Sequence, residues 1–264
     1  MVLRREEEFD RTDLDIPKAN ERGQIHRDYI AHCMRWSYAC RFLNSGDPDW
    51  GYERDKWGSA QRFSNCDIMD VGCGEDLMLY RAANSNRYLP KSYTGIDINK
   101  LSTPEGFEGS RVQPTLLEET DFLSVKVEDL PTRPNVVTSF EVVEHVPLEY
   151  AKKMLKHMYD LSTENAYLLI STPCFCPRRG MAANHINEML REDFKQYLED
   201  AGWVIKHNYG TFGGRNDLYK HMTPEHQELF NQLNAYHDKN VIATMFAPIY
   251  PEHSRNNLWV CRKD

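Results

Sequence analysis

Long apolar runs are absent from this 264-residue sequence. No segment approaches the run of about 18 apolar residues that spans a bilayer. The first residues, 1–8, are largely charged, whereas a secretion signal needs an apolar centre. We therefore predict no membrane segment and a cytoplasmic location.

Paired cysteines and an excess of positive charge are also missing. The seven cysteines form no C-x-x-C pair, and the closest two, Cys174 and Cys176, lack zinc-knuckle spacing, so we expect free thiols. Lysine and arginine number 32 against 40 aspartates and glutamates, a net charge of −8. An acidic chain has no overall attraction to a phosphate backbone. This favours a small-molecule substrate over nucleic acid.

Residues 66–80 predict a strand, a tight turn and a helix. An apolar run at 68–71 leads into Gly72 and Gly74, and a helical pattern begins at Leu77. Because glycine has no Cβ, a ligand could approach the backbone there, and the first N–H groups of the next helix lack helical partners. The segment is a candidate cofactor cradle.

Two acidic residues accompany this cradle. Asp70 precedes the first glycine, and Asp97 ends a second β-prone run, 92–97, at the spacing of a ribose-binding carboxylate. A nicotinamide-dependent (NAD) oxidoreductase is an alternative, but its motif usually has a third glycine. This chain instead has Asp76 after the turn, which would repel a pyrophosphate.

The run Asp70-Val-Gly-Cys-Gly74, followed by Gly95-Ile-Asp97, resembles the cofactor motifs of class I S-adenosylmethionine (SAM) methyltransferases. The resemblance covers roughly residues 66–212. It implies a SAM-dependent enzyme with an α/β, Rossmann-like, doubly wound, mostly parallel seven-stranded sheet. The cofactor-binding residues that it implies are Asp70, Gly72, Cys73, Gly74, Asp97, Ile98, Val127, Glu128 and Phe140.

We predict one methyltransferase domain over residues 1–264. The roughly 45 residues between the last two expected strands exceed a hairpin loop, so a helical lid is expected before the last strand. Its helix is expected around 223–235, with a loop to Pro251. The predicted parts are a loose arm (1–22), an N-terminal helix and cap loop (25–60), the SAM-binding core (66–210) and the lid (211–256).

Within the core, the third strand and an adenine-binding turn are expected at 122–131. Later strands are expected at 135–140 and 166–173, and the last two, 203–209 and 257–261, are expected to form an antiparallel pair at the sheet edge.

A segment of the N-terminal helix, His32-x-x-Arg35-Trp36-x-x-Ala39, is similar to one that precedes the first motif in some SAM methyltransferases. The resemblance implies that Arg35 meets the SAM carboxylate and that the Trp36 ring covers the site. The alternative is a packing helix with a surface arginine.

Acidic residues and histidines follow the fourth and fifth strands, where doubly wound sheets bind ligands. Glu141, Glu144 and His145 are spaced i, i+3, i+4, which places them on one face if the chain turns helical there. His185 follows the neighbouring strand. Carboxylate and imidazole together suit Mg²⁺, Mn²⁺ or Fe²⁺.

This pattern is similar to that of ubiquinone-pathway O-methyltransferases. It is also similar to that of small-RNA 2′-O-methyltransferases, and in the small-RNA enzymes two glutamates and two histidines hold a divalent ion. The resemblance implies O-methylation of a small molecule, assisted by Mg²⁺ or Mn²⁺. It also implies Glu141 and His145 as catalytic residues and Glu141, Glu144, His145 and His185 as metal ligands.

Several alternatives stay open. His145 could act as a general base without metal or have a structural role. At the level of function the alternatives are an RNA 2′-O-methyltransferase, an NAD-dependent oxidoreductase and a non-catalytic SAM-binding partner protein.

Overall fold

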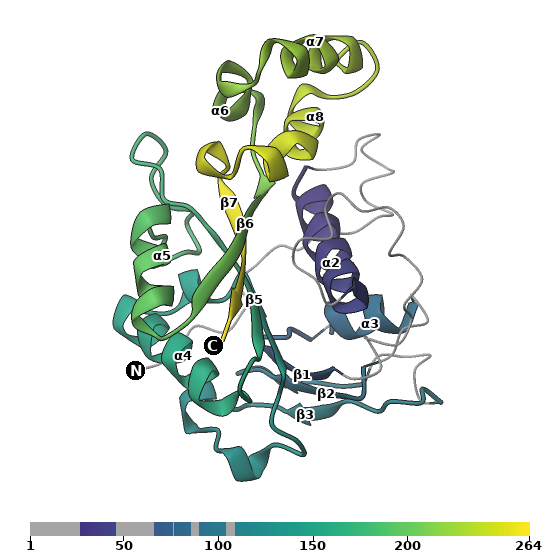
Figure 1. Ribbon diagram of the computed structural model, residues 1–264, viewed down its shortest axis with the longest axis vertical. Helices are drawn as coiled ribbons and strands as arrows, with labels where there is room; N and C mark the ends of the chain where they lie inside the picture. The colour runs from purple at the N-terminus through teal and green to yellow at the C-terminus, as the bar shows by residue number, and fades with distance from the viewer. Residues whose placement is uncertain (1–26, 46–65, 76, 86–89, 104–108) are drawn as a thin grey trace.

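The computed structural model describes residues 27–45, 66–75, 77–85, 90–103 and 109–264 (Figure 1). The predicted arm (1–22), the whole of the predicted cap loop (46–60) and Asp76 lie outside the described residues.

A seven-stranded sheet forms the centre of the described chain, in the order β3-β2-β1-β4-β5-β7-β6. Strands β1 to β5 run parallel, and β7 runs antiparallel to both β5 and β6. This confirms the predicted Rossmann-like, mostly parallel sheet with an antiparallel pair at one edge. The strands are β1 (Asp67–Val71), β2 (Ser92–Ile96), β3 (Thr115–Leu117), β4 (Val136–Phe140), β5 (Tyr167–Pro173), β6 (Val204–Phe212) and β7 (Asn256–Arg262).

Helices cover both faces of the sheet, as a doubly wound fold requires. Figure 1 shows α4 (Leu148–Leu161) and α5 (Arg191–Asp200) on one side and α2 (Arg27–Ser45) and α3 (Met78–Ser85) on the other. Two separate apolar clusters fill the two interfaces. All five residues of β1 are buried, as expected of a central parallel strand. None of the described helices is long and apolar enough to cross a membrane.

The prediction of a third strand at 122–131 is wrong. The third strand is the short β3 (Thr115–Leu117). The carboxylate of Asp121 caps a 3₁₀ turn, η5 (Phe122–Ser124), and a second turn, η6 (Val127–Asp129), follows. Local bonds from aspartate to the backbone therefore outweigh the β-prone composition of this segment.

A helical lid lies between β6 and β7. The helix predicted around 223–235 is present, but the loop predicted after it contains a further helix, α8. Asp238 caps α8, and buried apolar residues of α8 join a cluster within the lid. The lid consists of α6 (Arg215–Leu218), η8 (Tyr219–His221), α7 (Pro224–Leu233), α8 (Lys239–Phe246), η9 (Ala247–Ile249) and η10 (Pro251–His253).

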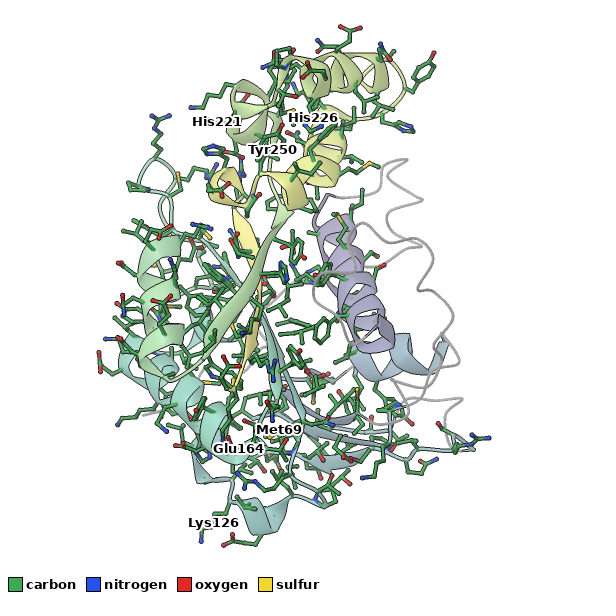
Figure 2. The ribbon with its side chains drawn as sticks, viewed as in Figure 1. Met69, Lys126, Glu164, His221, His226 and Tyr250 are labelled. Carbon is green, nitrogen blue, oxygen red and sulfur yellow. The ribbon has the colours of Figure 1, made fainter. Side chains whose placement is uncertain are left out.

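Contacts inside the lid join its first and last parts. Figure 2 labels His221, His226 and Tyr250 there. The His226 Nδ1 lies 2.6 Å from the Tyr250 hydroxyl, and the rings of His221 and His253 stack with centroids 3.4 Å apart. The lid is thus packed against itself as well as joined to the sheet.

Both ends of the lid lie at the carboxyl edge of the parallel strands. Asn256, which begins β7, pairs with Pro173 at the end of β5 and with Phe212 at the end of β6. The lid therefore leaves the sheet at the edge where doubly wound sheets bind ligands. Its helix α8 contacts α2, and Figure 1 shows the two helices one above the other.

Gly72 fixes the turn after β1. Its φ is +71°, and a Cβ at this position would lie 2.3 Å from Cγ2 of Val142. Gly74 has a similar φ of +68°, but a Cβ there would have no atom within 4 Å.

We expect Gly72→Ala to lower the free energy of unfolding by about 2–5 kcal/mol, because left-handed backbone costs about 1–2 kcal/mol and overpacking about 1–3 kcal/mol. Gly74→Ala, the matched control, should lose only the backbone part, about 1–2 kcal/mol. Urea unfolding followed by circular dichroism measures both values. Equal losses would show that the contact with Val142 is relieved at little cost.

Candidate functional site

Most of the predicted site residues lie at the carboxyl ends of four neighbouring strands, β1, β2, β4 and β5. They form two halves: a glycine turn with Asp97 after β1 and β2, and a glutamate–histidine group after β4 and β5.

The glycine turn is held against the end of β2. The N–H groups of Gly72 and Cys73 donate to the carbonyl of Ile96, at 2.8 and 3.3 Å. The N–H of Gly74 donates to Oδ2 of Asp97 at 2.9 Å. The structure thus brings these predicted cofactor residues together at the ends of two adjacent strands.

Asp97 is 7% exposed, and its other oxygen, Oδ1, accepts from the N–H and the Nδ2 of Asn99, at 2.9 and 3.0 Å. These bonds fix the direction of the carboxylate. Since a carboxylate offers about four acceptor positions, Asp97 can still accept a further hydroxyl. Ile98, beside it, is half-buried.

Asp70 is 4% exposed and joins three strands. Its two oxygens accept from the Tyr93 hydroxyl of β2 and the Thr138 hydroxyl of β4, both at 2.6 Å. Burial raises the pKa of the Asp70 carboxyl to about 6. The carboxylate therefore holds together the strand ends on which the glycine turn is built.

The other predicted cofactor residues lie apart from the glycine turn. Val127, which is 42% exposed, and Glu128 are on the surface turn η6. Phe140 ends β4 and packs on the apolar cluster beneath α2. Their part in cofactor binding stays a prediction.

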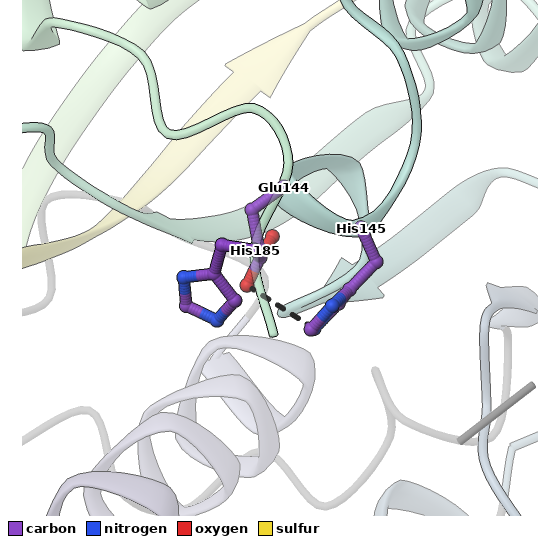
Figure 3. Close-up of side chains that lie close together, drawn as sticks. All are labelled: Glu144, His145 and His185. Carbon is purple, nitrogen blue, oxygen red and sulfur yellow. Dashed lines mark ion pairs between the residues drawn. The ribbon is translucent and has the colours of Figure 1, made fainter. Parts of the chain in front are cut away.

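Glu144, His145 and His185 form the glutamate–histidine group (Figure 3). Each offers a ligand atom, and these atoms all lie within 4.8 Å of one another. Glu144 is fully buried: its Oε2 accepts from the Thr172 hydroxyl at 3.2 Å, whereas its Oε1 has no hydrogen-bond partner among the described residues. Nε2 of His145 lies 4.0 Å from this Oε1.

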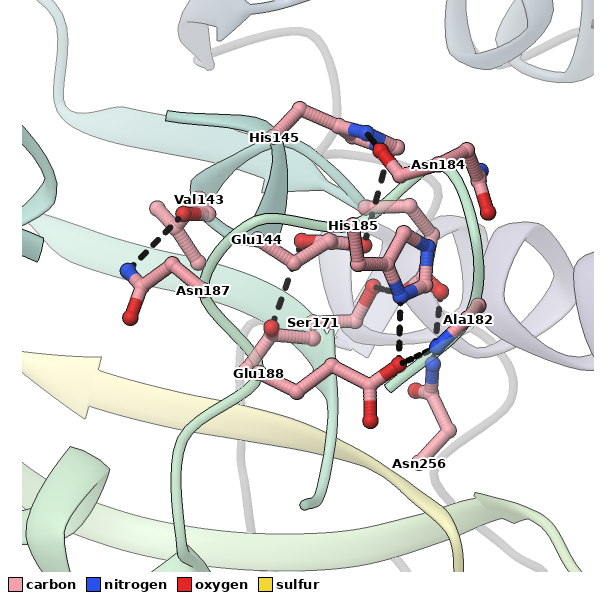
Figure 4. Close-up of polar contacts among 12 residues, drawn as sticks. Val143, Glu144, His145, Ser171, Ala182, Asn184, His185, Asn187, Glu188 and Asn256 are labelled. Carbon is pink, nitrogen blue, oxygen red and sulfur yellow. Dashed lines mark hydrogen bonds and ion pairs between the residues drawn. The ribbon is translucent and has the colours of Figure 1, made fainter. Parts of the chain in front are cut away.

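The two imidazole rings are oriented through their Nδ1 atoms (Figure 4). Nδ1 of His145 lies 3.1 Å from the carbonyl oxygen of Asn184, and Nδ1 of His185 lies 2.6 Å from Oε1 of Glu188. Both partners are acceptors, so each Nδ1 carries the proton and each Nε2 is the nitrogen that can bind a metal.

Backbone bonds bring the distant His185 to Glu144. The N–H groups of Ile186 and Asn187 donate to the carbonyl oxygen of Glu144, at 3.0 and 3.1 Å. The loop after β5 is thereby fastened to η7 (Val143–His145), which follows β4.

Electrostatics in the group favour a cation. Burial, together with the charge of Glu141, raises the pKa of the Glu144 carboxyl. Burial, together with His185, lowers the pKa of His145. A positive ion between them would stabilise the carboxylate and would bind the neutral imidazoles, so it would oppose the cost of burying this charge.

Glu141, predicted as a fourth ligand, is not brought into this group. Its φ is +58°, and its oxygens accept from the Ser171 hydroxyl and from Nδ2 of Asn256, both at 2.6 Å. Nη1 of Arg35 lies 3.7 Å from its Oε1. Glu141 thus links β4, β5, β7 and α2.

Arg35 is 2% exposed, so the alternative of a surface arginine is wrong. Its guanidinium pairs with Glu141 and contacts Nδ1 of His32, while its Nε has no hydrogen-bond partner among the described residues. Trp36 stacks on His32, with ring centroids 5.4 Å apart. The contact of Arg35 with SAM stays a prediction.

Sequence reasoning missed two residues of the site, Glu188 and Asn256. The i, i+3 spacing of His185 and Glu188 was a usable signal, because metal-binding histidines commonly pair with a carboxylate. Nothing in the sequence linked Asn256 to Glu141.

A family model for the methyltransferase domain matches residues 56–208. The chain belongs to the methyltransferase domain family. This confirms the predicted class I SAM-dependent methyltransferase, with SAM as cofactor, and goes against the NAD-dependent alternative.

Individual relatives agree with this family. A mitochondrial ubiquinone biosynthesis O-methyltransferase of Schizosaccharomyces pombe is 30% identical over 112 residues, which cover 42% of this chain and 39% of that protein. The match thus spans about two fifths of the relative's length. The predicted cytoplasmic location stays a prediction.

Solved structures share the fold. A magnesium protoporphyrin IX methyltransferase from Synechocystis PCC 6803 with bound S-adenosylhomocysteine (SAH) has a TM-score of 0.56 at 12% identity, over 95% of this chain and 88% of that one. A small RNA methyltransferase has a TM-score of 0.53 at 16% identity, over 88% of this chain and 25% of that one.

We expect Asp97→Ala to weaken SAM binding by about 10- to 100-fold, because hydrogen bonds to a charged group contribute about 1.5–3 kcal/mol. Titration calorimetry with SAM and SAH measures the change. The control is Asp238→Ala, which removes the carboxylate that caps α8 in the lid. This variant should bind SAM normally. Unchanged SAM affinity in a folded Asp97→Ala protein would contradict the assignment.

Proposed function

We propose that this chain transfers the methyl group of SAM to a hydroxyl oxygen of a small-molecule acceptor, assisted by a divalent ion at Glu144, His145 and His185. The observation that carries the proposal is the buried Oε1 of Glu144, which has no hydrogen-bond partner among the described residues and lies beside two imidazoles held by their Nδ1 atoms.

The donor set fits a small divalent cation. Ligand atoms about 2.0–2.3 Å from one ion lie roughly 3–4 Å apart. The three atoms here are within 4.8 Å of one another, so small side-chain rotations would complete the coordination. One carboxylate with two imidazoles is compatible with the predicted Mn²⁺, or with Fe²⁺, and fits less well with Mg²⁺, which prefers oxygen ligands.

Such an ion, when bound, would lower the pKa of an acceptor hydroxyl and stabilise the attacking oxygen. The chain's own residues would set the geometry. The glycine turn and Asp97 would hold SAM at the ends of β1 and β2, and Glu144, His145 and His185 would hold the acceptor side at the ends of β4 and β5. Because β1 pairs with β4, the two halves are neighbours.

The chain also supports a small acceptor. Its net charge of −8 gives no general attraction to RNA. The lid leaves the sheet at the carboxyl edge of the parallel strands, where the site lies. In this position it can limit the space beside the site that is open to an acceptor, and it can exclude water. The relative from S. pombe is an O-methyltransferase, which supports oxygen as the attacked atom.

We expect Glu144→Gln to reduce methyl transfer by at least about 100-fold while SAM affinity changes less than about 2-fold, because the carboxylate serves the acceptor side only. SAH formation is measured with a panel of catechols and phenols, with and without EDTA and added Mn²⁺. Glu149→Gln, which changes a carboxylate 78% exposed on α4, is the control.

Two outcomes would contradict parts of the proposal. Activity that survives both chelation and Glu144→Gln would contradict the role of the metal and would favour His145 as the general base. The lowered pKa of His145 keeps its ring neutral and able to accept a proton. Methylation of RNA, with no turnover of the small-molecule panel, would contradict the proposal that the acceptor is a small molecule.

A further inference from the structure

Glu188 lies directly behind His185 in the glutamate–histidine group. Its side chain is 8% exposed, and that of His185 is 15% exposed. Oε1 of Glu188 lies 2.6 Å from Nδ1 of His185 and also accepts the backbone N–H of Ala182, at 2.9 Å (Figure 4). One oxygen therefore holds both the ring and the backbone of its loop at Ala182.

This contact acts on the nitrogen that faces the group. A carboxylate on Nδ1 keeps the proton there, so Nε2 carries the lone pair. The negative charge also makes Nε2 a stronger electron donor, and the short bond restricts rotation of the ring. Nδ1 of His145 instead faces a backbone carbonyl, that of Asn184, and is held without a charged side chain.

The backbone around Glu188 is fastened independently of its carboxylate. Ile186 and Asn187 donate to the carbonyl of Glu144, and the carbonyl of Met189 accepts from the N–H of Phe175 at 2.8 Å. These bonds flank Glu188 on both sides. Removing its carboxylate should therefore release the His185 ring without detaching the loop.

We propose that Glu188 is a positioning residue: it orients His185 and raises the affinity of Nε2 for the divalent ion without contacting the ion itself. This inference rests on the metal site of the proposed function, but it can fail separately.

The test measures Mn²⁺ binding to the full chain by electron paramagnetic resonance, without SAM or acceptor. Glu188→Ala should weaken Mn²⁺ binding by about 10- to 100-fold, the usual effect of losing the partner of a metal-binding histidine. Glu188→Gln, which keeps an acceptor oxygen without the charge, should lose less. SAM affinity should be unchanged in both variants.

A matched control is Glu192→Ala. Its carboxylate is 71% exposed and pairs with Arg191, so Mn²⁺ affinity should equal that of the wild type. The absorption spectrum of bound Co²⁺ provides a second measurement: it should change in Glu188→Ala, because the His185 ring is no longer fixed, and should not change in Glu192→Ala.

The outcomes separate the two proposals. Wild-type Mn²⁺ affinity in Glu188→Ala, with binding lost in Glu144→Gln, would overturn the role of Glu188 and leave the metal site standing. No Mn²⁺ binding by the wild type would overturn the metal site and this inference with it. If Glu188→Ala does not fold, Glu188→Gln decides: unchanged affinity overturns the role, and weakened affinity with unchanged SAM binding supports it.

Discussion

The fully buried carboxylate of Glu144 is the feature on which the site depends. Taking a carboxylate out of water is costly unless hydrogen bonds or a cation stabilise it. Among the described side chains, the Thr172 hydroxyl hydrogen-bonds its carboxylate, while the backbone carbonyl of Glu144 holds the loop that carries His185. The same residue therefore provides the charge that attracts a cation and the anchor that brings the second histidine to it.

Close packing joins this group to the cofactor half. Val142, which lies between Glu141 and Glu144 in the sequence, occupies the space that a Cβ on Gly72 would need. The absence of a side chain at Gly72 therefore lets the chain after β4 approach the turn after β1. A glycine in such a turn is usually explained by the close approach of a ligand to the backbone. Here Gly72 is also required by the packing between the two halves of the site.

The sequence predicted the sheet and the glycine turn well, because buried strands and paired glycines have local signatures. It predicted three members of the glutamate–histidine group, but the spacing argument assumed a helix beginning at Glu141. The helical turn η7 begins at Val143, and the left-handed φ of Glu141 directs its carboxylate elsewhere. The third strand was misplaced for a related reason: the cap formed by Asp121 is a side-chain contact that strand propensity does not contain.

The hydrogen bonds of Glu141 also explain how an acidic residue so close to the group can stay outside it. Nδ2 of Asn256 donates to Glu141, and the carbonyl oxygen of the same amide accepts from the Thr211 hydroxyl at 2.7 Å. Thr211 and Asn256 lie at the two ends of the lid. For Glu141 to become a fourth ligand, it would have to give up its bonds to Ser171 and Asn256. That change would release the side-chain contact between the strand ends and the base of the lid.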